Sequence, residues 1–274
     1  MSLIPLLTIP GGFIATGGTT YTQGGYTYHK FTSSGTFTVV RGSKTLEMLV
    51  VGGGGAGGTA TLTTGSSDYS YGGGGGAGGL LTNTYSAISL SITVGAGGVP
   101  KATEYGGYSQ VLTIPSVGSP ALIASAVGGG AGAKPSTGTA AQTGGSGGGA
   151  GLKKISGFTT SYAKAIGTAL QGNNGGDAVN AAENSGGGGG HGGGYTSSGG
   201  TGPTSGGAGT SDYSSWFDSG GTNLAAGGLG GRTVNSPGVT DYGQGGFGGA
   251  SVGSSTYTDA YAGAAGVVII RYAV

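Results

Sequence analysis

Glycine is gathered into near-continuous clusters, and this feature restricts the possible folds of the chain more than any other. The densest clusters are GGGGAGG (52–58), GGGGGAGG (72–79), GGSGGGAG (144–151) and GGGGGHGGG (186–194). Glycine accounts for 73 of the 274 residues, against about 7 % in an average protein. Collagen needs glycine at every third position of a proline-rich chain, whereas these glycines are consecutive and the chain has only 8 Pro. A collagen triple helix is therefore excluded.

Charge and cysteine content exclude further classes. The chain has 10 Lys and Arg against 9 Asp and Glu, which leaves a net charge of +1, and it has no Cys. Disulfide scaffolds and thiolate metal sites need Cys. Nucleic-acid binding needs a basic patch, which scattered cations do not form. An expanded disordered tail needs a high net charge and low hydrophobicity. None of these classes is expected, and no nucleic-acid partner is expected.

Membrane insertion and export are not expected either. The longest apolar stretch near the start, 3–10, is far shorter than the ~20 residues that a membrane-spanning helix needs. It also lacks the basic region of a secretory signal. We therefore expect a protein that is made in the cytoplasm.

Alternation of apolar and polar residues predicts an all-β fold. The predicted strands lie near 26–32, 36–41, 45–51, 87–94, 110–114, 121–127 and 266–272. The last run is apolar on both faces, which is typical of a central strand covered on both sides. We therefore expect the end of the chain to pair with the early strands in a small antiparallel sheet or sandwich. The best helical candidate, 162–171, is weak, so almost no α-helix is expected.

Glycine-rich sequence of this kind is ordinarily a flexible linker. Here, however, hydrophobic strands run directly into several clusters, and aromatic residues lie between them. The alternative is a polyglycine II-type helix, which is extended, has three residues per turn and makes no internal hydrogen bonds. Because glycine has no Cβ, such helices can pack side by side and bond to one another. We expect packed helices of this type, with Ala56, Ala77, Ala131 and Ala150 facing outward or lying at the cluster ends.

The first residues differ from the rest of the chain. Segment 1–25 combines Pro5 and Pro10 with several apolar side chains and no charged residue. We predict that 1–25 is an attachment leader that becomes ordered against a partner subunit. Residues 26–274 are predicted to form one glycine-rich domain.

Several blocks of the sequence together resemble a known family. They are YTYHKFTSSGTFTV (26–39), LEMLVVGGGGAGG (46–58), GGGGGAGG (72–79), SITVGAGG (91–98) and the closing GVVIIRY (266–272). These blocks resemble the glycine-rich domain of bacteriophage tail proteins. More loosely, the chain is similar to the adhesins at the tail-fibre tips of T-even-like phages, in which polyglycine helices pack into a sandwich.

The resemblance implies a virion protein of the tail fibre or tail tip. Such a protein would bind a host cell-surface receptor, either a protein or a glycan, through loops between the glycine runs. It would also contact other tail or fibre subunits, with 1–25 as the docking segment. A homotrimer and a monomer that caps a trimeric fibre are both open, and so is a structural or decoration role without receptor binding. An ice-binding protein is a third hypothesis, but it needs a regular Thr or Ala face that the sequence lacks.

Aromatic residues between the glycine clusters are the candidate receptor-binding residues. Tyr and Trp beside Ser, Gly and Asn are typical of antibody paratopes, where rigid aromatic rings supply contact area at low entropic cost. The candidates are Tyr69, Tyr71, Phe158, Tyr162, Tyr213, Trp216, Phe217, Tyr242, Tyr257 and Tyr261. The alternative for each residue is packing over the bundle ends as a local core. That alternative is weaker for 213–217, because this group has much aromatic area beside two acids.

No catalytic site, metal site or cofactor is expected. His29 and His191 lack partners for a triad or a metal site, and His29 is expected to be an ordinary strand residue. Asp212 and Asp218 could flank a sugar as paired carboxylates, but nothing else in the sequence supports a glycosidase. The pattern G-x-G-x-x-G arises by chance in glycine runs.

Overall fold

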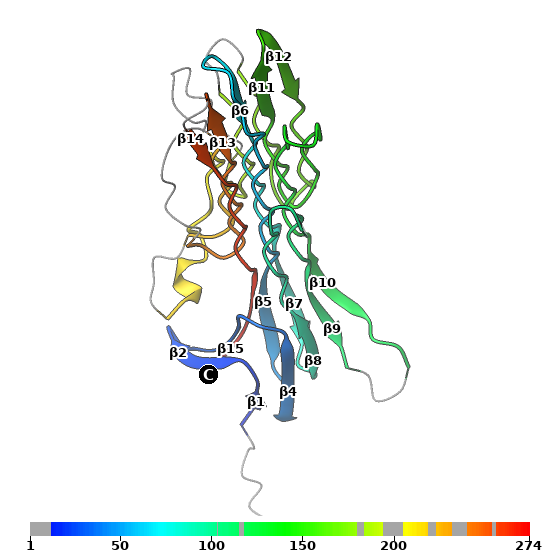
Figure 1. Ribbon diagram of the computed structural model, residues 1–274. Coiled ribbons are helices and arrows are strands. Elements are labelled where there is room, and N and C mark those ends of the chain that lie inside the picture. Colours follow the sequence, from blue (N-terminus) through cyan, green and yellow to red (C-terminus); the bar gives the residue numbers. More distant parts are fainter. Residues whose placement is uncertain are drawn as a thin grey trace, which may run out of the picture.

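The computed structural model describes residues 12–102, 104–114, 118–179, 184–193, 205–218, 223–231, 240–253 and 256–274. The molecule is elongated and has three zones (Figure 1). Two five-stranded sheets lie at one end, extended glycine segments occupy the middle, and a third five-stranded sheet lies at the other end. Every strand pairing in the sheets is antiparallel, which confirms the predicted all-β fold.

The first sheet contains the end of the chain as its central strand. Its order is β2 (Thr19–Gln23), β3 (Tyr26–Phe31), β15 (Val267–Ala273), β5 (Thr45–Val51) and β7 (Leu80–Ser86). Ile270 of β15 lies opposite His29 on one side and Met48 on the other. The side chains of Val267 to Ile270 are all fully buried. The prediction of a central strand that pairs with the early strands is therefore confirmed.

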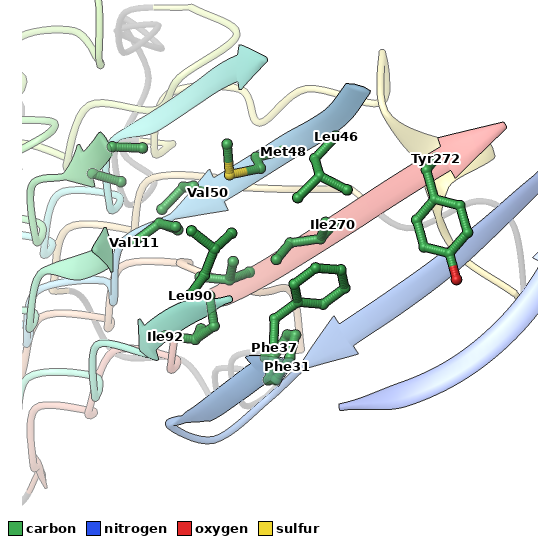
Figure 2. Close-up of a cluster of buried hydrophobic side chains, with 13 residues drawn as sticks. Phe31, Phe37, Leu46, Met48, Val50, Leu90, Ile92, Val111, Ile270 and Tyr272 are labelled. Atoms are coloured by element: carbon green, nitrogen blue, oxygen red, sulfur yellow. The ribbon is translucent and has the colours of Figure 1, made fainter. Parts of the chain in front are cut away.

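The second sheet packs on the first to form a sandwich. Its order is β1 (Ile14–Thr16), β4 (Gly35–Arg41), β8 (Leu90–Thr93), β9 (Ser109–Thr113) and β10 (Leu122–Ala126). Figure 2 shows the core between the two sheets, where Phe37 and Leu90 of the second sheet meet Met48 and Ile270 of the first. Alternate residues of each strand face this core, as the period of a β-strand requires.

The strand predictions were correct in place but incomplete. The run 87–94 contains only the four-residue strand Leu90–Thr93, and segment 162–171 contains no helix. Strands β1 and β2 lie inside the predicted leader, and they pair with β4 and β3. The described part of segment 1–25 therefore belongs to the sandwich, while residues 1–11 lie outside the described residues.

The glycine segments are held together by backbone hydrogen bonds whose direction repeats every three residues. The amides of Gly52, Gly55 and Gly58 all donate to carbonyls of segment 72–79, with N···O distances of 2.8–2.9 Å. The amides of Gly53 and Ala56 donate to carbonyls of segment 104–107. Those of Gly54 and Gly57 donate to carbonyls of segment 261–264. Each turn of three residues therefore joins one segment to three different neighbours. The clusters are bonded structural segments and not linkers.

These glycines are required by close approach, not by unusual backbone angles. A Cβ added to Gly188 would lie 1.8 Å from the carbonyl oxygen of Gly75, and one added to Gly75 would lie 2.2 Å from that of Gly55. Positive φ angles occur instead at turn glycines such as Gly24 and Gly25, between β2 and β3. Among the described glycines of 52–58 and 72–79, none has a positive φ.

The expectation that the alanines of the clusters face outward is wrong. Ala56 and Ala77 are fully buried, and Ala131 and Ala150 are almost so. Ala77 packs in the apolar cluster on the outer face of the first sheet, together with Leu80 and Leu224. At this position the neighbours are side chains, and they leave room for a methyl group that a backbone neighbour would exclude.

Candidate functional site

The third sheet, which we call the tip sheet, lies at the end of the molecule away from the sandwich (Figure 1). Its order is β12 (Phe158–Tyr162), β11 (Gly151–Ile155), β6 (Tyr69–Tyr71), β13 (Ala250–Val252) and β14 (Thr256–Thr258). The sequence analysis predicted none of these strands. They are three to five residues long and polar, so their alternation of apolar and polar residues is too short to stand out.

Two of the candidate binding residues form the core of the tip sheet. The rings of Tyr69 and Tyr71 stack with their centroids 5.1 Å apart. Both residues are buried, and they pack with Leu152 of β11 and Ala250 of β13. For Tyr69 and Tyr71 the structure supports the alternative interpretation, packing as a local core.

Buried polar groups fasten the connections at the tip to one another. The Asp68 carboxylate accepts a hydrogen bond of 2.9 Å from the amide of Ser156, in the β11–β12 turn. The carbonyl of Asp68 accepts one from the amide of Gly253, which follows β13. The amide of Thr63 donates to the Ser251 hydroxyl oxygen, and the Thr63 hydroxyl donates to the carbonyl of Gly253. Three chain segments that are distant in sequence are therefore held in one arrangement.

Exposed aromatic side chains lie on the two edge strands of the tip sheet. Phe158 begins β12 directly after the turn and is 80 % exposed. Tyr257 on β14 and the nearby Tyr261 are each exposed by about two fifths, and Tyr162 at the end of β12 is partly buried. Four strand spacings separate β12 from β14, roughly 19 Å. These side chains therefore flank the tip and do not form one cluster.

Charged groups accompany Tyr257. Its hydroxyl donates to the Asp259 carboxylate at 2.8 Å, and Lys101 forms an ion pair with the same carboxylate oxygen at 2.9 Å. The hydrogen bond from Lys101 lowers the pKa of Asp259. Burial, together with the bond to Asp259, raises the pKa of the Tyr257 hydroxyl. The phenol therefore stays protonated at neutral pH and acts as a hydrogen-bond donor.

The remaining four candidates lie at the opposite end of the molecule, on the outer face of the first sheet. Residues 211–218, with the short 3-10 helix η2 (Ser214–Trp216), cover this face. Trp216 is only 6 % exposed, and Phe217 is fully buried and stacks on Tyr242. Tyr213 is partly buried and meets Trp216 edge to face. Trp216 and Phe217 therefore cover the sandwich, although the sequence favoured receptor binding for this group.

Arg271 holds residues 211–218, which we call the covering segment. Its contacts with Glu47, Tyr26 and Trp216 form what we call the arginine clamp. The guanidinium of Arg271 lies 3.9 Å from the centre of the Trp216 ring and 4.3 Å from that of Tyr26. Its Nε and Nη2 atoms both donate to Glu47 Oε2, at 2.9 and 2.6 Å. Partial burial lowers the pKa of Arg271, but hydrogen bonds to Glu47 and Tyr28 outweigh it and leave the pKa raised. The guanidinium is therefore permanently charged.

A groove of about 480 Å³ opens beside the arginine clamp. The first sheet supplies Glu47, Arg271, Thr82 and Thr84 to its floor, where Thr84 lies beside Glu47, and the covering segment supplies Asp212, Tyr213 and Trp216 to its wall. The sequence analysis missed this groove. The sequence signal that could have indicated it is a pair of opposite charges, Glu47 and Arg271, each within a largely apolar strand.

The part of the chain that the structure describes contains neither a candidate metal site nor a candidate membrane-spanning helix. No group of three or more His, Asp or Glu side chains there could hold a metal ion. No helix there is long and apolar enough to cross a bilayer.

His29 is buried in the sandwich, with Nδ1 at 2.7 Å from the carbonyl oxygen of Gly17 and Nε2 at 3.3 Å from the Tyr272 hydroxyl.

Comparison with known proteins identifies the family and nothing narrower. A search of curated protein sequences finds no significant match. A family model described as a glycine-rich domain matches residues 32–273, from the connection between β3 and β4 to the end of β15. The chain therefore belongs to the glycine-rich domain family.

Proposed function

We propose that the protein is a phage virion component of the tail fibre or tail tip that binds a host cell-surface receptor through the tip sheet and its loops. The observation that carries this proposal is the polarity of the molecule. Residue 12 and Val274 both belong to the sandwich end, whereas the tip sheet is the end farthest from them (Figure 1). Attachment of the sandwich end to the particle would leave the tip free.

The glycine segments supply the rigidity that such a role needs. We infer that they are polyglycine II-type helices, because their hydrogen bonds repeat every three residues and each segment has neighbours in three directions. A bundle that is bonded backbone to backbone has no side chains to repack. It therefore holds the tip loops at a defined distance from the sandwich, in keeping with the general use of rigid scaffolds to present binding loops.

The tip has the chemical character of a binding surface. Phe158, Tyr257 and Tyr261 offer exposed aromatic area, and Lys101 and Asp259 add charge beside Tyr257. Hydrogen bonds of the buried residues Thr63, Asp68 and Ser251 hold the loops in place. Aromatic rings on a preorganised frame lose little entropy on binding.

Adsorption of virions that carry substituted protein tests the proposal. Phe158→Ser and Tyr257→Ser remove exposed rings and break no core contact, so the protein should still assemble. We expect each to reduce adsorption to host cells by about tenfold or more, because exposed aromatic anchors carry much of the binding energy of an interface. Tyr85→Ser is the matched control, because Tyr85 is as exposed as Tyr257 but lies on the sandwich. Normal adsorption of both tip variants, with the protein incorporated, would overturn receptor binding and favour a decoration role.

Docking to other tail or fibre subunits is proposed for the start of the chain. Because β1 and β2 belong to the sandwich, removal of 1–25 would damage the fold, and removal of 1–11 is the cleaner test. We expect the shortened protein to keep its melting temperature and to be absent from purified particles. Normal incorporation of that protein would contradict docking through the first residues.

A further inference from the structure

The groove beside the arginine clamp offers a ligand site at the sandwich end, separate from the tip. Its lining residues come from elements distant in sequence: β5, β7, β15 and the segment 211–218. The Lys30–Asp218 ion pair, at 2.9 Å, fixes the end of that segment to β3. A hydrogen bond from the Tyr21 hydroxyl to the carbonyl of Trp216 fixes it to β2. The groove is therefore preformed.

The floor of the groove is electrically balanced. Glu47 accepts two hydrogen bonds from Arg271, and the guanidinium also lies over two aromatic rings. The charge of Arg271 is therefore already matched, and no other Lys or Arg among the described residues lines the groove. Asp212 on the wall adds a negative charge. A phosphate or carboxylate ligand would meet an occupied cation and a repelling carboxylate.

The lining of the groove combines hydroxyl groups with aromatic area. Thr82 and Thr84 are exposed on β7, and each hydroxyl can donate and accept hydrogen bonds. The covering segment carries the partly buried ring of Tyr213 and the acceptor oxygens of Asp212. A purely apolar ligand would leave these polar groups desolvated and unpaired, at a cost in affinity.

We propose that this groove binds a neutral carbohydrate of one or two sugar rings. A sugar ring has an apolar C–H face that can lie on Tyr213, and hydroxyl groups on its rim that donate to Asp212 and exchange hydrogen bonds with Thr82 and Thr84. It carries no charge, so the balance between Glu47 and Arg271 is undisturbed. This site does not depend on the proposed receptor role of the tip, and either can hold without the other.

The position of Trp216 provides a direct assay. It is the only Trp in the chain and lines the groove, so its fluorescence reports on ligand in this place. The probes are methyl glycosides of glucose, galactose, mannose and N-acetylglucosamine, and their β-1,4-linked dimers. Titration of the full chain should give a saturable fluorescence change with at least one probe, at a Kd of about 1 mM. Isothermal titration calorimetry on the same samples provides a second readout.

Two substitutions locate the binding. Asp212→Ala removes an exposed side chain and Thr84→Val replaces a hydroxyl with a methyl group, and both leave the hydrogen bonds between Arg271 and Glu47 in place. Each should weaken binding by about fivefold or more, while Asp259→Ala at the tip leaves it unchanged. The absence of saturable binding by both methods with every probe would overturn the proposal. Equal affinity in both groove variants would overturn it as well, and so would tighter binding of glucose 6-phosphate than of glucose.

Discussion

The sandwich and the glycine bundle bury their interiors by opposite means. In the sandwich, the two sheets are separated, and side chains such as Phe37 and Ile270 fill the space between them. In the bundle, segments approach until the carbonyl of one lies where a Cβ of the next would be, as at Gly188 and Gly75. One interior consists of side chains and the other consists of backbone.

The difference determines what each region tolerates. A side-chain core can repack, because rotamers change and neighbouring groups shift. A backbone core has no rotamers, and any displacement breaks hydrogen bonds that hold several segments at once. The bundle should therefore respond to one added methyl group as strongly as the sandwich responds to the loss of a whole ring.

The largest effect is expected for Gly188→Ala. The added methyl group would meet the Gly75 carbonyl oxygen at 1.8 Å, so a backbone segment must move. We expect the free energy of unfolding to fall by about 4 kcal/mol or more, measured by denaturant unfolding. Gly193→Ala in the same cluster is the matched control, because its nearest neighbour would be the Ala208 methyl at 3.9 Å. It should change stability by less than ~0.5 kcal/mol. Equal effects of the two would refute the backbone-core description.

The sandwich should give the complementary result. Phe37→Ala leaves a large cavity in a fully buried position and should cost about 3–5 kcal/mol. Ile270→Leu conserves volume and should cost less than about 1.5 kcal/mol, although Ile270 is also fully buried. Denaturant unfolding of both variants provides the measurement. A cost for Ile270→Leu as large as that for Phe37→Ala would mean that the sandwich is as intolerant as the bundle.

A smaller effect is expected at the arginine clamp, where one side chain fastens the covering segment. Arg271→Met keeps much of the packing but leaves the partly buried Glu47 without its partner. We expect a loss of about 1–3 kcal/mol, together with a shift of the Trp216 emission as the ring loses its cation. Lys101→Met breaks an exposed ion pair with Asp259 and should leave the melting temperature unchanged. An unchanged emission spectrum in Arg271→Met would contradict the clamp.

The smallest effect is a pH dependence located in the sandwich. Burial lowers the pKa of His29 below its ordinary value of 6.5, although the bond to Gly17 opposes the shift. Between the two pKa values the unfolded chain binds more protons, so stability falls as the pH falls from about 6.5 toward the lowered pKa. The melting temperature should therefore decrease between about pH 7.5 and pH 5.5, and less so in His29→Gln. The same decrease in both proteins would assign the pH dependence to another group.

Prediction from sequence succeeded where a strand has its own pattern. The run from Val267 to Ile270 is β-branched and apolar on both faces, so both its strand state and its central place could be predicted. The tip strands Tyr69–Tyr71 and Ala250–Val252 have three residues each, which is too short for any periodicity. They are strands because the bundle brings them side by side.

The candidate binding residues show the same limit. All ten lie between the glycine clusters, and their burial depends on partners far away in the chain. Phe158 is exposed because β12 is the edge of its sheet, and Tyr71 is buried because β6 is the centre. Composition could not distinguish them, since both are aromatic residues beside Ser and Thr.

The sequence alone determined the all-β class, the central last strand and the need for close backbone packing, because these follow from local pattern and from the absent Cβ. The tertiary structure decided which carbonyl each glycine meets, which aromatic residues are buried, and that Glu47, Arg271 and Trp216 line one groove. These features join residues from 15 positions apart, as in the bond from Gly58 to Gly73, up to 224 positions apart, as in that between Arg271 and Glu47. Contacts at such separation depend on how the whole chain packs, and no local pattern encodes them.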